Sequence, residues 1–172
     1  MFETERLIVR PWESADAARA FDIYSKEAVT KWIGMDKPLD DPAQGEKMIA
    51  RWADLAAKHD HRYGCWAAQI KETGVIAGTI LLVPLPDPAD GRFPGAIEVG
   101  WHFHPDSWHR GYATEAARGA LQLADSYGLT EIFAIAWPGN DPSLAVMRRL
   151  GMSYLGRTDR WYDREAECYV LR

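Results

Sequence analysis

The chain has 172 residues, of which 47% are hydrophobic, enough to build one core rather than two small ones. Its formal net charge is −5 and it contains no lysine- or arginine-rich run, which argues against nucleic acid as a partner, because phosphate neutralisation needs clustered basic side chains. An acidic chain is compatible with a cationic or amine substrate. We therefore expect one domain over residues 1–172 with a single cleft.

No apolar stretch approaches the roughly 20 residues that a transmembrane helix requires, and the opening MFETERLIVRPW is charged where a secretory signal is apolar. A cytoplasmic location is expected on this basis. The two cysteines, Cys65 and Cys168, lie far apart and neither belongs to a CxxC motif. They predict neither a zinc site nor a disulfide, and we interpret them as buried thiols.

The chain begins with a strand pattern followed by two helical patterns. Residues 6–11 place β-branched side chains before a proline, which predicts a short strand. In residues 15–26, apolar side chains recur at helical spacing behind candidate N-cap residues, so a first helix is expected there. Residues 42–59 carry the same periodicity after two prolines, which predicts a second helix.

A hairpin, a loop and a further strand come next. Residues 63–70 and 75–83 are apolar and β-rich, and the short polar turn between them contains glycine, so we expect them to pair. Residues 84–95 hold four prolines and two glycines and predict an exposed loop. Residues 96–104 then predict a strand.

The last part of the chain alternates helices and strands before a final hairpin. The longest helical pattern covers residues 113–127 and ends beside Gly128, while a shorter one at residues 142–150 is closed by Gly151. Strands are predicted at residues 131–137, 152–161 and 165–171. Hairpins combined with at least one β-α-β crossover predict a mixed central sheet flanked by helices.

The turn between strand 96–104 and helix 113–127 is suited to bind an anion. Backbone N–H groups at a helix start lack intrahelical acceptors and lie at the positive end of the helix dipole. Gly111 allows the backbone to approach a pyrophosphate, and Arg110 adds a guanidinium. Taken alone, Gly111 is equally an ordinary turn glycine. The turn lacks the GK[ST] and G-x-G-x-x-G patterns, so a nucleoside triphosphate or a nicotinamide dinucleotide is a poor candidate ligand.

The stretch RGYATEA at residues 110–116 resembles the R/Q-x-x-G-x-G/A pyrophosphate loop of the GNAT acetyltransferases, in the form typical of the ribosomal-protein N-acetyltransferase branch. His109 stands where the family usually has Arg or Gln. Residues 140–152, NDPSLAVMRRLGM, resemble the family's N-x-x-S-x-x-(V/L)-x-x-x-L-G-F/M block, and the opening TERLIVRP resembles the branch's first strand. The three similarities occur in the family's order and span nearly the whole chain.

The resemblance implies the GNAT fold, a mixed α+β architecture in which about four helices flank a mostly antiparallel sheet of about seven strands. It also implies an N-acetyltransferase that uses acetyl-CoA as co-substrate, needs no metal, and acts on a primary amine, either a protein N-terminus or a small molecule. The residues implied to bind the cofactor are Phe103, His104, His109, Arg110, Gly111, Tyr112, Ala113, Thr114, Asn140 and Ser143. The resemblance also implies that strand 96–104 splays from its neighbour, so that free backbone N–H groups of Phe103 and His104 face the thioester carbonyl and stabilise its oxygen.

Acetyl transfer to an amine requires a base, because an alkylamine with a pKa of about 10 is mostly protonated at neutral pH. Glu98, on the strand that leads to the loop, is the candidate base, and its alternative interpretation is an outward-facing strand carboxylate. The resemblance places Ser143 near the CoA sulfur, where it would protonate the thiolate. Asn140 and Ser143 also form an ordinary helix N-cap pattern. Tyr154 is a further candidate acid.

Trp32 and Met35 fall in the region that covers the acceptor cleft in the family and are therefore acceptor-site candidates. His102 and His104 alternate on one strand face, but no third metal ligand is suitably spaced, so we expect a hydrogen-bonded or cleft-lining role for them. Three alternatives remain open: an antibiotic or polyamine acetyltransferase, a non-catalytic acyl-CoA sensor, and a nucleotide-binding scaffold. A homodimer is also compatible with the sequence.

Overall fold

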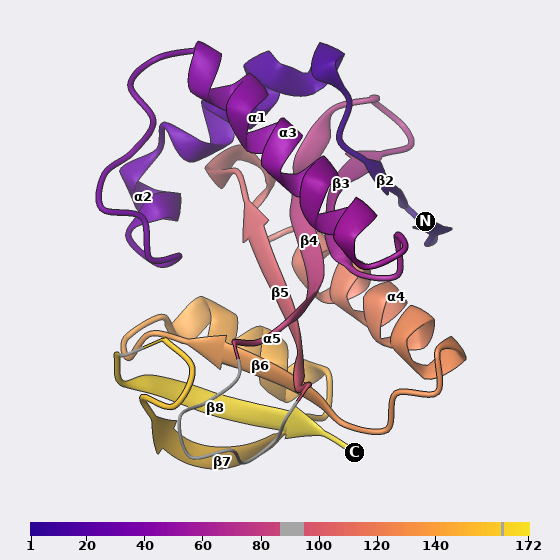
Figure 1. Cartoon of the computed structure of the whole chain (residues 1–172), viewed down its shortest axis with the longest axis vertical. Helices are drawn as coiled ribbons and strands as arrows, with labels where there is room; N and C mark the ends of the chain where they lie inside the picture. The colour runs from indigo at the N-terminus through magenta and orange to yellow at the C-terminus, as the bar shows by residue number, and fades with distance from the viewer. Residues whose placement is uncertain (87–94, 163) are drawn as a thin grey trace.

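The structure, a computed structural model, describes residues 1–86, 95–162 and 164–172. Within these residues, eight strands form one mixed sheet in the order β1-β2-β3-β4-β5-β6-β8-β7, and five α-helices pack on it (Figure 1). The strands are β1 (Phe2–Glu3), β2 (Leu7–Pro11), β3 (Gly64–Ile70), β4 (Ile76–Pro84), β5 (Ile97–Phe103), β6 (Ile132–Ala136), β7 (Ser153–Thr158) and β8 (Ala166–Leu171). The helices are α1 (Ala17–Tyr24), α2 (Glu27–Thr30), α3 (Ala43–Lys58), α4 (Tyr112–Ser126) and α5 (Asp141–Arg149).

This architecture confirms the predicted mixed, mostly antiparallel sheet with flanking helices. Two elements, β1 and α2, were not predicted, because segments of two and four residues are too short to show a periodicity. The predicted loop at residues 84–95 falls for the most part on residues 87–94, which lie outside the described residues, and Pro84 still belongs to β4. No helix of the described ranges is long and apolar enough to cross a membrane.

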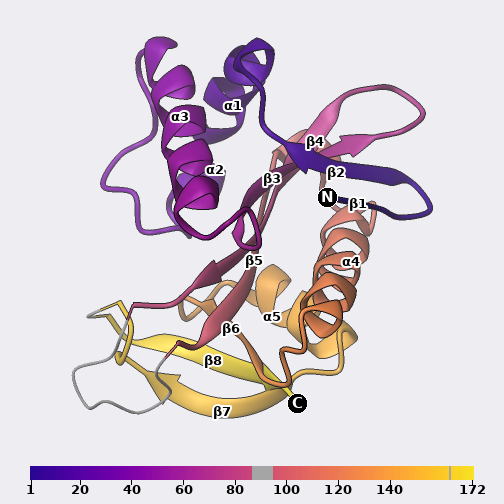
Figure 2. The same cartoon turned by 45° about the vertical axis from the view of Figure 1, so that its right-hand side comes forward.

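The helices cover opposite faces of the sheet (Figure 2). On one face, α4 and α5 contribute buried alanines and Met147 to a core that extends under β2 to β6 and β8. On the other face, Ile23 and Tyr24 of α1 pack with Ile49 of α3 against Ala67 of β3. The sheet is thus buried on both sides along its central strands, which explains why β3 and β4 appear in the sequence as nearly continuous apolar runs.

The central strands β5 and β6 are the feature that positions the site. They form the one parallel pair among the described strands, and they pair only through Ile97 with Ile132 and through Glu98 with Phe133. From Val99 onward β5 pairs with β4 alone, and the two parallel strands diverge (Figure 1). Because α4 follows β5 and α5 follows β6, the starts of both helices lie at the edge where the strands separate.

Candidate active site

The turn that joins β5 to α4 provides an anion-binding cradle, which we define as residues 109–114. A short 3-10 turn, Pro105–Ser107, leads into it. His109 has a φ of 59° and Gly111 a φ of 80°, so the chain enters the left-handed region twice before α4 begins at Tyr112. Within the described ranges, the backbone N–H groups of the cradle donate no hydrogen bond. Several donors therefore face one small region at the positive end of a helix dipole, an arrangement that fits a pyrophosphate.

The glycine at position 111 has a structural reason. At its φ of 80° a side chain would be strained, and a Cβ would lie 3.4 Å from a guanidinium nitrogen of Arg6. A non-glycine residue at φ 59°, as at His109, is uncommon and typical of strained functional turns. Arg110 is exposed, and its guanidinium forms no ion pair with any described residue, so it is free to reach a phosphate oxygen.

The backbone of β5 differs from the prediction at His104. Its N–H donates to the carbonyl oxygen of Ala77 at 2.9 Å, so the prediction that this group faces the thioester is wrong. The carbonyl of Phe103 points to the opposite side of the strand and accepts a hydrogen bond of 2.7 Å from the indole of Trp108. Since backbone groups alternate along a strand, those of Trp101 share the direction of Phe103, toward the gap beside β6.

Glu98 lies at the point where β5 and β6 begin to separate. Its side chain is buried, with a residue exposure of 8%, so the interpretation as an outward-facing carboxylate is wrong. One carboxylate oxygen accepts a hydrogen bond of 2.5 Å from the Tyr162 hydroxyl, and the carboxylate also accepts one from the backbone N–H of Ile135. Burial raises its pKa to about 7, although both hydrogen bonds oppose the rise. A carboxylate with this pKa can exchange a proton at neutral pH, as a general base must.

Tyr162 was not singled out from the sequence, because it lies 64 residues from Glu98 in the connection between β7 and β8. Burial and the neighbouring Glu98 carboxylate raise the pKa of its hydroxyl, which keeps the phenol protonated and able to donate. Its ring meets the Trp137 ring edge-on at 5.9 Å, and the guanidinium of Arg164 lies 4.8 Å from the centre of the same indole. An aromatic group therefore lies beside Glu98.

Asn140 and Ser143 lie at the start of α5. The Asn140 side chain accepts a hydrogen bond of 3.4 Å from the backbone N–H of Ser143, which confirms the N-cap interpretation. The Ser143 hydroxyl forms no hydrogen bond to the described part of the chain and is partly exposed. Because α5 follows β6 as the cradle follows β5, both groups lie at the same edge of the sheet. No observation links Ser143 to a thiolate, and that role stays a prediction.

The acceptor candidates divide between the site and the core. The ring of Trp32 lies 4.0 Å from the Cβ position of Gly139, beside the turn that leads to Asn140. Met35 instead packs against the core formed by α1, α2 and α3. Tyr154 lies on the outer strand β7, where its hydroxyl donates to Glu167 at 2.6 Å, and two strands separate it from β5. The structure therefore brings Trp32 to the site and does not bring Tyr154 there.

Both histidines, His102 on β5 and His104 directly after it, form hydrogen bonds, as expected. His102 Nδ1 lies 3.0 Å from the Tyr24 hydroxyl, and burial lowers the His102 pKa to about 4, so the ring is neutral. His104 Nδ1 accepts a hydrogen bond of 3.2 Å from the backbone N–H of Asp106, while its buried Nε2 lies 3.4 Å from the Asp22 carboxylate and has no hydrogen-bond partner among the described residues. Within the described residues, no group of three or more His, Cys, Asp or Glu side chains is arranged to hold a metal ion.

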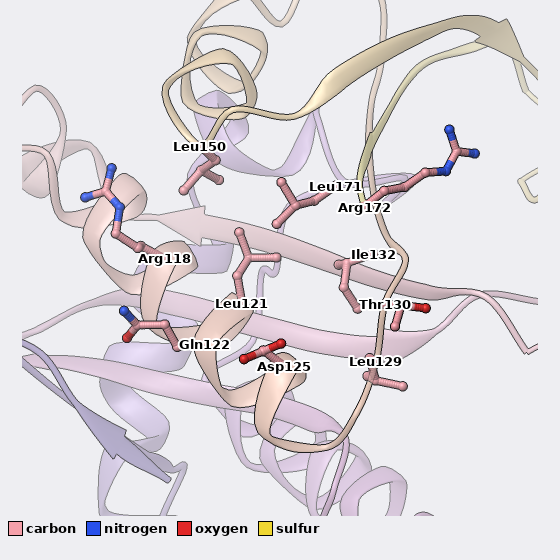
Figure 3. A pocket seen from close by; sticks show the side chains of 10 residues that line it. All are labelled: Arg118, Leu121, Gln122, Asp125, Leu129, Thr130, Ile132, Leu150, Leu171 and Arg172. Carbon is pink, nitrogen blue, oxygen red and sulfur yellow. The ribbon is translucent and has the colours of Figure 1, made fainter.

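A hollow of about 490 Å³ lies at the opposite end of α4 from the cradle (Figure 3). Its apolar floor comes from the C-terminal half of α4, the start of β6 and the end of β8, and Arg118 and Arg172 stand at its rim. Arg172 is already paired with Glu131 at 2.7 Å. The hollow is separate from the diverging strands and contains none of the predicted site residues.

A mixed sheet whose central parallel strands diverge beside a glycine-bearing helix start defines an acetyltransferase fold. The family model for the acetyltransferase (GNAT) domain matches residues 6–153, and the chain belongs to that family. A relative described as an uncharacterized N-acetyltransferase, YnaD of Bacillus subtilis (strain 168), is 35% identical over 170 residues, covering 93% of this chain and 91% of that protein.

Solved structures agree with this assignment. The crystal structure of the acetyltransferase from Agrobacterium tumefaciens str. C58 superposes with a TM-score of 0.79 at 28% identity, covering 99% of this chain and 93% of that one. RimL, a ribosomal L7/L12 alpha-N-protein acetyltransferase solved in complex with coenzyme A, has the same fold, with a TM-score of 0.78 at 12% identity over 97% of this chain and 94% of that one. The predicted acetyltransferase class is confirmed.

Proposed function

We propose that this protein transfers the acetyl group of acetyl-CoA to a primary amine by direct attack of the amine on the thioester. The observation that carries the proposal is the cradle of unpaired backbone N–H groups, placed where β5 and β6 diverge. The family uses acetyl-CoA as a co-substrate. The family match over residues 6–153 supports the view that residues 1–172 work as a single acetyltransferase domain.

In the proposed reaction, bound acetyl-CoA supplies the acetyl group as a reactive thioester. Glu98 takes the proton that the amine must lose, directly or through one water, and its pKa of about 7 suits this exchange near neutral pH. The amine nitrogen then bonds to the carbonyl carbon as the carbon–sulfur bond breaks. Ser143 gives its hydroxyl proton to the sulfur and takes up the second proton that the nitrogen loses on becoming an amide. The backbone N–H of Trp101 is the candidate donor to the carbonyl oxygen as negative charge develops there.

The acceptor is proposed to be a protein N-terminus or a small amine. Aromatic side chains from three segments, Trp32, Trp137 and Tyr162, lie near the divergence on the side of Glu98. A buried carboxylate beside aromatic rings favours a primary amine, which becomes neutral by losing a proton to that carboxylate. The resemblance to the ribosomal-protein branch and the shared fold with RimL make N-terminal peptides the first acceptors to test.

Calorimetric titration with acetyl-CoA, CoA, ATP and NAD tests the cofactor without knowledge of the acceptor. We expect micromolar binding of acetyl-CoA and CoA, none of comparable strength for ATP or NAD, and a large loss for Gly111→Val. Gly128→Val is the matched control, because Gly128 closes the same helix with a φ of 75° and no atom lies within 4 Å of its Cβ position. Absence of acetyl-CoA binding, or equal losses in both variants, would refute the proposed cradle.

Transfer itself is measured as release of free CoA thiol on addition of amines or N-terminal peptides. Glu98→Gln is expected to reduce turnover at least a hundredfold at neutral pH while binding of acetyl-CoA is retained, since general base catalysis typically contributes about 10²–10⁴ in rate. Ser143→Ala tests the acid in the same assay. Full activity of the Glu98 variant would remove Glu98 from the mechanism.

A further inference from the structure

The turn between β1 and β2 is tied to the first turn of α4 by an ion-pair network that we name the Arg6–Glu115 clasp. One oxygen of the Glu115 carboxylate accepts hydrogen bonds from the Thr4 hydroxyl at 2.5 Å and from the Arg6 backbone N–H at 2.8 Å. The other oxygen accepts from Arg6 Nε at 2.7 Å and lies 2.6 Å from Arg6 Nη2. Two guanidinium nitrogens thus converge on one carboxylate oxygen while the backbone N–H of Arg6 and the Thr4 hydroxyl hold the other, which fixes both side chains in one orientation.

The clasp reaches the cradle through the remaining nitrogen of Arg6. Its Nη1 donates a hydrogen bond of 3.0 Å to the carbonyl oxygen of Arg110, and the guanidinium lies 4.8 Å from the centre of the Tyr112 ring. The carbonyl of Arg110 and the N–H of Gly111 belong to one planar trans peptide unit, so they point in opposite directions. Holding the carbonyl against Arg6 therefore turns the Gly111 N–H away from Arg6, toward the open side of the cradle.

The clasp also settles the charge at this helix start. Although burial by itself raises the pKa of Glu115, hydrogen bonds from Thr4 and Arg6 bring it below its usual value, so the carboxylate is ionised. An isolated carboxylate in the first turn of α4 would oppose a bound pyrophosphate. The Arg6 guanidinium cancels this charge at contact distance, and the side chain of Glu115 is only 16% exposed.

We propose that Arg6 is a positioning residue of the pyrophosphate cradle, which it serves by orienting the peptide between Arg110 and Gly111 and by neutralising Glu115. Glu115 acts through Arg6, as the anchor of its guanidinium. The inference rests on the proposed use of acetyl-CoA. It explains why residues 109 positions apart in the chain are joined by an ion pair and a backbone hydrogen bond at the start of the cofactor helix.

The test compares two ligands that share the thioester arm and differ in the 3′-phospho-ADP part, which contains the pyrophosphate. Acetyl-CoA carries the pyrophosphate, whereas S-acetyl-pantetheine carries the same thioester arm without it. Arg6→Gln is expected to weaken acetyl-CoA binding about tenfold or more, because a well-placed hydrogen bond to a charged group is lost and a carboxylate is left unpaired. The Arg6→Gln variant is expected to bind S-acetyl-pantetheine as well as the unsubstituted protein does, as measured by saturation-transfer NMR.

Arg10→Gln is the matched control. Arg10 lies on the same strand β2, its guanidinium is paired with Asp16 at 2.7 and 3.0 Å, and it has no contact with the cradle. It is expected to lower the melting temperature as Arg6→Gln does but to leave the affinity for acetyl-CoA unchanged. Equal weakening of both ligands by Arg6→Gln, or an unchanged affinity for acetyl-CoA, would overturn the positioning role.

A second variant separates the two parts of the clasp. Glu115→Gln alone is expected to weaken binding of acetyl-CoA, since Arg6 loses its anchor, but when added to Arg6→Gln it is expected to recover part of the lost affinity, because it removes the unpaired carboxylate. Additive losses in the double variant would contradict the view that Glu115 acts through Arg6. If the unsubstituted protein fails to bind acetyl-CoA, the proposed function itself fails, and this outcome is distinguished because it requires no substitution.

Discussion

Replacing Glu98 by Gln is expected to make the protein more stable at high pH and, in the same step, to impair acetyl transfer. Burial raises the pKa of Glu98 from 4.5 to about 7, so the folded chain holds a proton that the unfolded chain has released. The stability that Glu98 contributes is therefore fully present below pH 4.5 and is lost as the pH rises through about 7. At about 1.4 kcal/mol per pKa unit, the full penalty is about 3 kcal/mol. Glutamine keeps the shape and does not titrate.

The effect is hidden in the unsubstituted protein by a second buried group on the same strand. Burial lowers the pKa of His102 from 6.5 to about 4, so stability is lost as the pH falls from 6.5 toward 4. Between pH 8 and pH 5, Glu98 adds about 2.5 kcal/mol of stability while His102 removes about 2 kcal/mol, and the two contributions nearly cancel. Comparison of Glu98→Gln with the unsubstituted protein removes the His102 contribution, because both proteins share it.

The assay is urea unfolding of both proteins at pH 5 and pH 8. The free energy of unfolding of Glu98→Gln relative to the unsubstituted protein is expected to be about 2.5 kcal/mol higher at pH 8 than at pH 5. Glu167→Gln is the control, because hydrogen bonds from Tyr154 and Arg157 lower the pKa of Glu167 below 4.5, so its carboxylate is largely ionised at both pH values and little pH-dependent difference is expected. A pH-independent difference for Glu98→Gln would refute the argument that its carboxylate is buried at this cost.

Three further predictions concern the site and the core. Tyr162→Phe removes a hydrogen bond to the ionised form of Glu98 and so raises the pKa of this carboxyl, which is expected to move the acidic limb of the pH–rate profile upward by about one pH unit. An unchanged limb would show that it does not report the titration of Glu98. Gly78→Ala is expected to lower the free energy of unfolding in urea by about 1–3 kcal/mol, because the new Cβ would lie 2.6 Å from the Cα of Phe103 in the neighbouring strand. An unchanged free energy would show that β4 and β5 can move apart to accept the methyl group. Met147→Ala, at 1% exposure, is expected to lower stability by about 2–5 kcal/mol in the same assay without changing acetyl-CoA affinity.

The elements whose signals are local could be predicted from the sequence. The periodicity of residues 113–127 and the glycine at position 111 lie within one continuous segment, and the structure places α4 at Tyr112–Ser126 with Gly111 in the left-handed region before it. The Asn140 cap is equally local, since its partner is three residues away. Short elements without a period, such as α2, could not be predicted for the same reason.

The chemical state of the candidate site depends on contacts between distant segments. From the sequence alone, the Glu98 side chain on its strand could be either buried or exposed. Its high pKa arises only because β6 and the segment that contains Tyr162 enclose it. The N–H of His104 was predicted to be free, but the pairing of β5 with β4 occupies it. Strand register decides which backbone groups remain unpaired, and register depends on the whole sheet.

The sequence by itself determined the family, the glycine turn before α4 and the order of the strands and helices other than β1 and α2, because each of these is encoded in contiguous residues with a recognisable period or motif. Only the tertiary structure decided that β5 and β6 diverge after Glu98, that Tyr162 donates to this carboxylate, and that Arg6 lies against the carbonyl of Arg110. These features join residues 35 to 104 positions apart, and no local pattern carries information about such contacts.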